Sequence, residues 1–211
     1  MSYAVYKTEA IILRTLPSQE ANADVVFLTR DLGKITVRAQ AARKLESKMR
    51  MQLTRYHHVV IDVVRGAHIW RLTGIAEGAR HATFTEPGLL HAFHRAATLA
   101  EHLIRGEEAH PELFDFFVGL LTYIDREVVR NASLANERWH ATVSSMTEGS
   151  GADGASGLEL YAVIKVLDHL GYWPGEKLPE IPDNEIVQKC LQQKTELVAT
   201  INEAIRASQI T

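Results

Sequence analysis

The sequence predicts an α+β fold, in which an N-terminal five-stranded β-barrel of the OB type is followed by an α-helical domain without a zinc element. Three observations predict it. The first 75 residues consist of short β-type segments separated by turn residues. From residue 76 onward, apolar residues recur with a helical period, and the sign of the net charge changes between the two parts. We expect an OB domain over residues 1–78 and a helical domain over residues 79–211.

The predicted strands are runs rich in β-branched and aromatic residues that are bounded by turn residues. In one of them, Ile35, Val37 and Ala39 alternate with polar residues and therefore share one face. Gly33 supplies a tight turn just before that strand. Five short strands joined by hairpin-like connections fit a small closed barrel, although a three-stranded sheet with an extra hairpin gives nearly the same pattern. The predicted strands cover residues 3–16, 23–29, 35–39, 56–64 and 69–75.

The second part predicts five helices from apolar stripes and from start and stop signals. Thr85 and Pro87 mark the first start, and Gly106 marks the first stop. Asp183 or Asn184 caps the last helix, and Gly171 ends the one before it. Residues 148–157 contain no apolar residue larger than Ala, which predicts a flexible loop. The predicted helices cover residues 87–105, 111–130, 133–146, 158–171 and 183–207.

The net charge of −3 conceals an asymmetry between the two parts. Residues 1–75 hold 12 Lys and Arg against 6 Asp and Glu, which gives +6. Residues 76–211 hold 11 against 20, which gives −9. This split favours a basic module for a polyanion joined to a separate acidic body. The densest cationic run lies between two predicted strands, where barrel loops reach a ligand, and it contains Arg38, Arg43, Lys44, Lys48, Arg50 and Arg55 against Glu46.

Aromatic rings could add base stacking to this cationic run. Phe27, Tyr56 and Trp70 are candidates in the predicted barrel. For each ring taken alone, burial in the barrel core is the favoured interpretation. For the cationic run, polyanion binding is favoured over a solvated loop, because the acidic charge is segregated elsewhere in the chain.

Catalytic and metal sites have little support. The chain lacks a G-x-S-x-G elbow, a P-loop, a dinucleotide-binding G-x-G-x-x-G and an H-E-x-x-H motif, so we expect no enzyme and no catalytic residue. His91 and His94 could share a metal ion on a helix, but a surface pair is favoured. Cys190 is the single cysteine and is expected to be a small buried residue. We expect neither a cofactor nor a metal.

No apolar run approaches the length of a membrane span, and charges interrupt the apolar stretch at the N-terminus. These features favour a cytoplasmic protein.

Several short segments resemble the bacterial recombination-repair RecO family. The most specific are the opening strand Tyr6-Lys7-Thr8-Glu9-Ala10-Ile11-Ile12-Leu13-Arg14 and the turn Thr29-Arg30-Asp31-Leu32-Gly33-Lys34. Pro111-Glu112-Leu113-Phe114 and Leu170-Gly171-Tyr172-Trp173-Pro174 are similar to landmarks of the family's helical domain. Where the family usually has Lys-Gly-Ala-Arg, this chain has Gln40-Ala41-Ala42-Arg43. Many members also carry four cysteines in a zinc element, which this chain cannot form.

The resemblance implies an OB fold joined to a helical domain, and a recombination mediator in DNA repair. Such a protein binds single- and double-stranded DNA, anneals complementary strands and helps to load the RecA recombinase. The implied partners are RecR and the single-stranded-DNA-binding protein, in the bacterial nucleoid. The family's basic positions correspond to Lys34, Arg43, Lys44, Lys48 and Arg50, and Arg38 and Arg55 are added because of their charge.

Two other hypotheses remain open. In the first, the basic barrel binds an acidic peptide and the chain is a protein–protein adaptor. In the second, the His91 and His94 pair holds a metal ion in an enzyme.

Overall fold

The computed structural model describes residues 4–18, 21–42, 49–67, 69–78, 87–141 and 151–209. Two compact units are present. The first comprises Met1–His81 together with Ile104–Asp115, and the second comprises Ala82–Leu103 together with Phe116–Thr211. The first unit therefore includes a segment, Ile104–Asp115, that lies within the helical domain predicted over residues 79–211.

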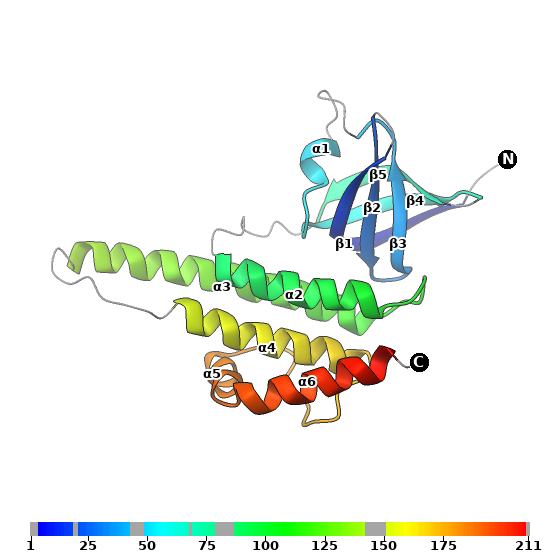
Figure 1. Cartoon of the computed structure of the whole chain (residues 1–211). Helices are drawn as coiled ribbons and strands as arrows, with labels where there is room; N and C mark the ends of the chain where they lie inside the picture. Colours follow the sequence, from blue (N-terminus) through cyan, green and yellow to red (C-terminus); the bar gives the residue numbers. More distant parts are fainter. Residues whose placement is uncertain are drawn as a thin grey trace. The chain divides into compact units, whose positions relative to one another are not determined.

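The first unit is built on a closed barrel with the strand order β1-β2-β3-β5-β4 (Figure 1). The closed barrel confirms the predicted OB-type architecture and excludes the open three-stranded alternative. One short helix, α1 (Met49–Gln52), was not predicted and lies between β3 and β4. The strands are β1 (Val5–Ser18), β2 (Asn22–Thr29), β3 (Gly33–Ala39), β4 (His58–Arg65) and β5 (Trp70–Glu77).

Strand β1 is long because it pairs with two neighbours in turn. Its first half pairs with β4, from Val5 opposite Val64 to Ile11 opposite His58. Its second half pairs with β2, and the register shifts between Ile12 and Arg14. Such a bulge bends the strand and lets one strand close the barrel.

The barrel core follows the alternation that the sequence predicted. Ile35, Val37 and Ala39 all point inward and are buried. Inward residues of the other four strands complete the core, together with two residues of the connection between β3 and β4. These residues are Ala10, Ile12, Ala23, Val25, Phe27, Ala42, Leu53, Val59, Ile61, Val63, Trp70 and Leu72.

The β2–β3 turn depends on Gly33, as the sequence predicted. Gly33 has a φ of +70°, in the left-handed region where a side chain is unfavourable. A Cβ at this position would also lie 2.1 Å from the carbonyl oxygen of Glu108. The segment Ile104–Asp115 therefore packs directly on this turn, within the first unit.

The structure has five helices after the barrel, as predicted, but some of their boundaries differ from the prediction. Gly106 and Gly171 have φ values of 75° and 76° just beyond two helix ends, and Asp183 caps α5 by accepting a hydrogen bond from the Ile186 amide at 2.8 Å. The helices are α2 (Pro87–Leu103), α3 (Pro111–Ala141), α4 (Gly151–His169), α5 (Asn184–Gln192) and α6 (Lys194–Gln209).

Two helix predictions were wrong. The separate helices predicted over 111–130 and 133–146 are one helix, α3, as far as Ala141. Asn131 and Ser133 are only weak helix breakers, so the hydrogen-bonded ladder runs through them. Conversely, the helix predicted over 183–207 is interrupted at Gln193. An unbroken helix would place Lys194, four residues after the buried Cys190, on the buried face.

The loop predicted over residues 148–157 is also corrected, since α4 already begins at Gly151. Residues 148–150 lie outside the described part of the chain. Gly157 serves close packing in this helix, because a Cβ there would lie 2.3 Å from the carbonyl oxygen of Val187 in α5. The absence of large apolar side chains was therefore misread as a sign of flexibility.

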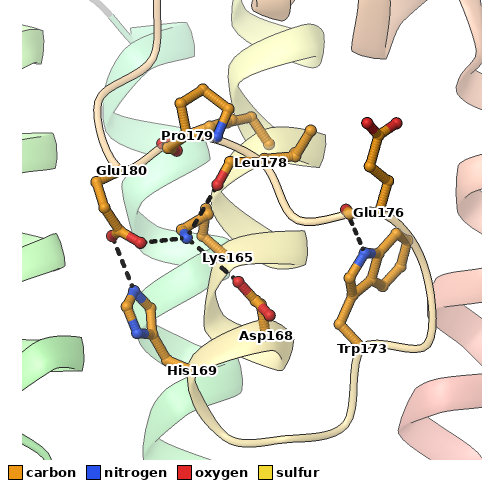
Figure 2. A network of polar contacts seen from close by, with 9 residues as sticks. Lys165, Asp168, His169, Trp173, Glu176, Leu178, Pro179 and Glu180 are labelled. Atoms are coloured by element: carbon orange, nitrogen blue, oxygen red, sulfur yellow. Dashed lines mark hydrogen bonds and ion pairs between the residues drawn. The ribbon is translucent and has the colours of Figure 1, made fainter.

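A buried lysine joins α4 to the segment that follows it (Figure 2). The side chain of Lys165 is 1% exposed, and its ammonium group lies 2.8 Å from Glu180 Oε1. It also lies 3.3 Å from Asp168 Oδ2 and donates to the carbonyl oxygen of Leu178 at 3.3 Å. His169 Nε2 is 3.3 Å from the other oxygen of Glu180. This network fixes the irregular segment 172–183 on α4.

Candidate nucleic-acid interface

Charged residues form a row across three strands on the outer face of the barrel. Asp24 of β2 lies opposite Arg38 of β3, and Arg38 lies opposite Arg71 of β5. The alternation along each strand sends these three side chains outward, because their neighbours Val25, Val37 and Leu72 are in the core. We call Asp24, Arg38 and Arg71 the charged row.

Arg38 is held by an ion pair within the charged row. Its Nε donates to Asp24 Oδ1 at 3.0 Å, and its Nη2 donates to Asp24 Oδ2 at 3.2 Å. This bidentate hydrogen bonding lowers the pKa of the Asp24 carboxyl below its usual 3.8, against the opposing effect of partial burial. A phosphate group that binds Arg38 must therefore compete with Asp24.

The Asp24–Arg38 pair predicts a stability that depends on pH. A carboxyl whose pKa is lowered by folding stabilises the folded state above its unfolded pKa, and this contribution is lost as the pH falls through the folded pKa. We therefore expect Asp24→Asn to be less stable than the parent at neutral pH. The difference should shrink below pH 3.8 and vanish once the carboxyl is protonated in the folded protein. Urea denaturation of both proteins across this range measures it, and a difference that is constant with pH would contradict the assignment.

The remaining part of the outer β2–β3 face is less polar than the charged row. Lys34 lies opposite Leu28, and Thr36 lies opposite Val26. Leu28 and Val26 point away from the barrel core but are buried, whereas Lys34 is half-buried. Lys34 and Arg38 are thus both half-buried, whereas Arg71 on β5 is exposed.

The connection between β3 and β4 contains most of the predicted DNA-binding residues. Arg43, Lys44 and Lys48 lie outside the described residues, and Arg50 is described only through its backbone in α1. Arg55 has a structural role, because its Nε donates to the carbonyl oxygen of Leu13 at 2.7 Å.

The returning end of this connection is fastened to the bulge of β1. The Arg55 guanidinium lies 4.7 Å from the centre of the Tyr56 ring, and the Tyr56 amide donates to the carbonyl oxygen of Ile12 at 2.7 Å. The hydroxyl of Thr15 also donates to the carbonyl oxygen of Leu53, at 3.3 Å. These contacts anchor the C-terminal end of the basic run beside β1.

Ala41 stands where the resemblance described above implies a glycine, and its backbone has a conformation that favours glycine. Its φ is 53°, in the left-handed region. The Ala41 amide donates to Asn22 Oδ1 at 3.0 Å, which links this turn to the start of β2. The alanine therefore adopts a conformation that a glycine adopts without steric cost.

Ala41→Gly is expected to stabilise the protein by about 0.5–1 kcal/mol. The free energy gained by relief of the left-handed strain exceeds the free energy lost because glycine gives the unfolded chain more conformational freedom. Thermal denaturation should show a rise in Tm of roughly 2 °C. Gln40→Gly serves as a control, because it adds the same flexibility to the unfolded chain at a residue whose own backbone is not left-handed. A lower Tm for Ala41→Gly would contradict the interpretation.

The aromatic candidates are all in the core, as the sequence favoured. Phe27, Tyr56 and Trp70 are buried. Two residues that sequence reasoning missed are exposed on the same barrel: Arg71, next to Arg38, and Tyr6 at the start of β1. The alternation of residues 69–75 contains the signal for Arg71, because Trp70 and Leu72 take the inward positions.

The histidine pair provides no metal site. His91 Nδ1 is 3.4 Å from Glu159 Oε2, and His94 Nδ1 is 3.4 Å from the Thr98 hydroxyl. Among the described residues, no three His, Cys, Asp or Glu side chains are grouped so as to hold a metal ion. Cys190 is buried, and burial raises the pKa of its thiol, as befits a small core residue. None of the described helices has the length and apolar character needed to cross a bilayer.

Comparisons with known proteins agree with the barrel architecture. Residues 1–77 match the family model described as "Recombination protein O N terminal". The chain is 30% identical over 118 residues to the DNA repair protein RecO of Roseiflexus sp. (strain RS-1), which covers 56% of this chain and 41% of the relative. It is 31% identical over 121 residues to that of Dehalococcoides mccartyi (strain CBDB1), covering 57% and 48%.

A third relative, the DNA repair protein RecO of Myxococcus xanthus (strain DK1622), is 30% identical over 133 residues, with 61% of this chain and 54% of the relative covered. The chain thus spans about half the length of the curated relatives that it matches. These alignments are longer than the barrel match itself. These matches confirm the resemblance that the sequence predicted, and residues 1–77 are similar to the N-terminal domain of the RecO family.

Proposed function

We propose that this protein takes part in DNA repair as a non-enzymatic recombination mediator that binds single- and double-stranded DNA and promotes the annealing of complementary strands. The observation that carries the proposal is the outward charged row on a closed OB-type barrel, with Arg38 and Arg71 side by side in register. The adjoining β3–β4 connection adds Arg43, Lys44, Lys48 and Arg50 in sequence. The match of residues 1–77 to the RecO N-terminal domain supports the same function.

Annealing in this proposal requires no bond-making group. Cations that lie along two phosphate backbones reduce the repulsion between complementary strands, and base pairing supplies the driving force. Arg38 contributes once a phosphate displaces the Asp24 carboxylate. RecR, the single-stranded-DNA-binding protein and, indirectly, RecA are the proposed partners, with assistance in RecA loading as the proposed outcome.

The test is a titration of labelled single-stranded and duplex oligonucleotides at several salt concentrations. The affinity for single strands should fall with a slope of roughly −0.7 in log–log form for each phosphate contacted. Charge reversal at Arg43, Lys44, Lys48 and Arg50 should lower both the affinity and the slope, whereas Asp24→Asn should raise the affinity by removing the competing carboxylate. A flat salt dependence would contradict the proposal.

A matched control reverses the charge of four exposed basic residues of the second unit, which are Lys177, Lys189, Lys194 and Arg206. This variant has the same net charge as the barrel variant but should bind DNA with nearly unchanged affinity. Strand annealing on DNA coated with the single-stranded-DNA-binding protein then tests the mediator activity. Competition with a labelled acidic peptide tests the adaptor hypothesis, which requires that the peptide bind and that DNA fail to displace it.

A further inference from the structure

The end of the barrel at which β1 begins carries a half-exposed tyrosine. Tyr6 is 41% exposed, and it is the one exposed aromatic residue among the described residues of the barrel strands. Its ring meets the ring of Trp70 edge to face, with centres 5.4 Å apart and planes at 84°. An exposed ring held by a buried neighbour presents apolar surface to solvent in a fixed place.

Trp70 is itself held by a hydrogen bond to the segment Ile104–Asp115. Its indole Nε1 donates to Glu107 Oε1 at 2.9 Å, and the rest of its side chain lies in the barrel core. Tyr6 therefore rests on a rigid support. Because little side-chain entropy remains to be lost, a planar ligand can stack on such a ring with a small ordering cost.

One arginine lies beside this tyrosine, on the ring that supports it. The Arg65 side chain is 66% exposed, and its guanidinium lies 5.4 Å from the centre of the Trp70 ring. Tyr6 lies opposite the core residue Val63 and therefore on the same face as Trp70. The exposed Tyr6 ring and the Arg65 guanidinium thus both contact the Trp70 ring.

Glu107 pairs with Arg65 at 3.2 Å, between side chains that are both well exposed. Exposed ion pairs of this kind contribute little stability, so a phosphate oxygen can take the place of this carboxylate. The same glutamate keeps its hydrogen bond to Trp70 through its other oxygen. An anion can therefore reach Arg65 without loss of the support under Tyr6.

We propose that Tyr6 stacks on a base of single-stranded DNA while Arg65 holds a flanking phosphate. A ring beside guanidinium groups is the combination that single strands require, since the ring binds a base and the cations bind the backbone. The inference rests on the proposed function and names the single strand as the ligand of this site.

The test compares Tyr6→Leu with Tyr6→Phe in the full chain. The probes are a labelled thymidine oligonucleotide and an abasic oligonucleotide of the same length. Tyr6→Leu should weaken binding of the thymidine strand about tenfold, because base–aromatic stacking contributes roughly 1–3 kcal/mol per base. It should leave binding of the abasic strand unchanged. Tyr6→Phe keeps the ring and should bind both strands as the parent does.

The outcomes separate this proposal from the function on which it rests. Parent-like binding of the thymidine strand by Tyr6→Leu overturns the stacking proposal and leaves DNA binding intact, as does an equal loss on both strands. Failure of the parent protein to bind any DNA overturns both. Photo-crosslinking of the parent protein to an iodouracil-substituted strand needs no variant, and it should place the cross-link on Tyr6; a cross-link confined to other residues would refute the stacking.

Discussion

Gly33→Ala is expected to destabilise the protein by about 3 kcal/mol or more, through two separate effects. The first is a left-handed backbone at φ +70°, which costs an L residue roughly 1–2 kcal/mol. The second is steric, because the added Cβ would lie 2.1 Å from the carbonyl oxygen of Glu108. Since that atom belongs to backbone, either the β2–β3 turn or the segment Ile104–Asp115 must move. Chemical denaturation of the variant measures the loss.

Gly106→Ala is the matched control for Gly33→Ala. Gly106 has nearly the same conformation, with φ +75°, but nothing lies within 4 Å of an added Cβ. This variant should lose only the backbone contribution of roughly 1–2 kcal/mol. The difference between the two variants then isolates the contact with Glu108. Equal losses would show that the segment moves aside freely and that its packing on the turn contributes little.

Lys165→Ala is expected to cost about 3 kcal/mol, because removal of one partner from a buried charge network leaves the other groups without compensation. The carbonyl oxygen of Leu178 and the carboxylate of Asp168 both lose their contact with the ammonium group. Glu180 can return to water, since its side chain is 65% exposed, and this limits the loss. Chemical denaturation measures the loss of stability. Amide hydrogen exchange over residues 172–183 should become faster, because the network that fixes this segment on α4 is lost.

Lys165→Met distinguishes the charge from the packing. Methionine fills a similar volume. If burial of the aliphatic part of the lysine side chain is the main contribution, the free energy of unfolding of this variant should lie within about 1.5 kcal/mol of that of the parent. A loss as large as that of Lys165→Ala would instead assign the effect to the ammonium group. A parent-like stability of Lys165→Ala would contradict a stabilising role for the network altogether.

The barrel could be predicted from the sequence because each of its strands carries a local signal. In β3 the inward Val37 precedes the outward Arg38, and in β5 the inward Trp70 precedes the outward Arg71. The two-residue alternation along each strand therefore identifies the inward face. The turn at Gly33 has a glycine where the backbone requires one. The charge asymmetry predicted an interface in the first part of the chain, but the Asp24–Arg38 pair depends on strand register, which no single segment encodes.

The helical part was harder to predict because α4 is surrounded by other elements. The sequence predicted one apolar stripe on this helix, yet Tyr161 and Lys165 are also buried. Both are polar residues whose partners come from a distant segment: the Tyr161 hydroxyl donates to the carbonyl oxygen of Pro179 at 2.7 Å. Burial raises the pKa of that hydroxyl. A buried lysine cannot be recognised until Leu178 and Glu180 are known to lie beside it.

The return of Ile104–Asp115 to the barrel bears on how this chain acquires its structure during synthesis. The first unit is discontinuous, since residues 82–103 are inserted between its two parts. A nascent chain that ends near residue 78 carries every strand but lacks Glu108, which packs on Gly33, and Glu107, which accepts a hydrogen bond from Trp70. We therefore expect the barrel to be only marginally stable on the ribosome until Asp115 has emerged, and an excised fragment to need residues up to 115 in order to fold as this unit does.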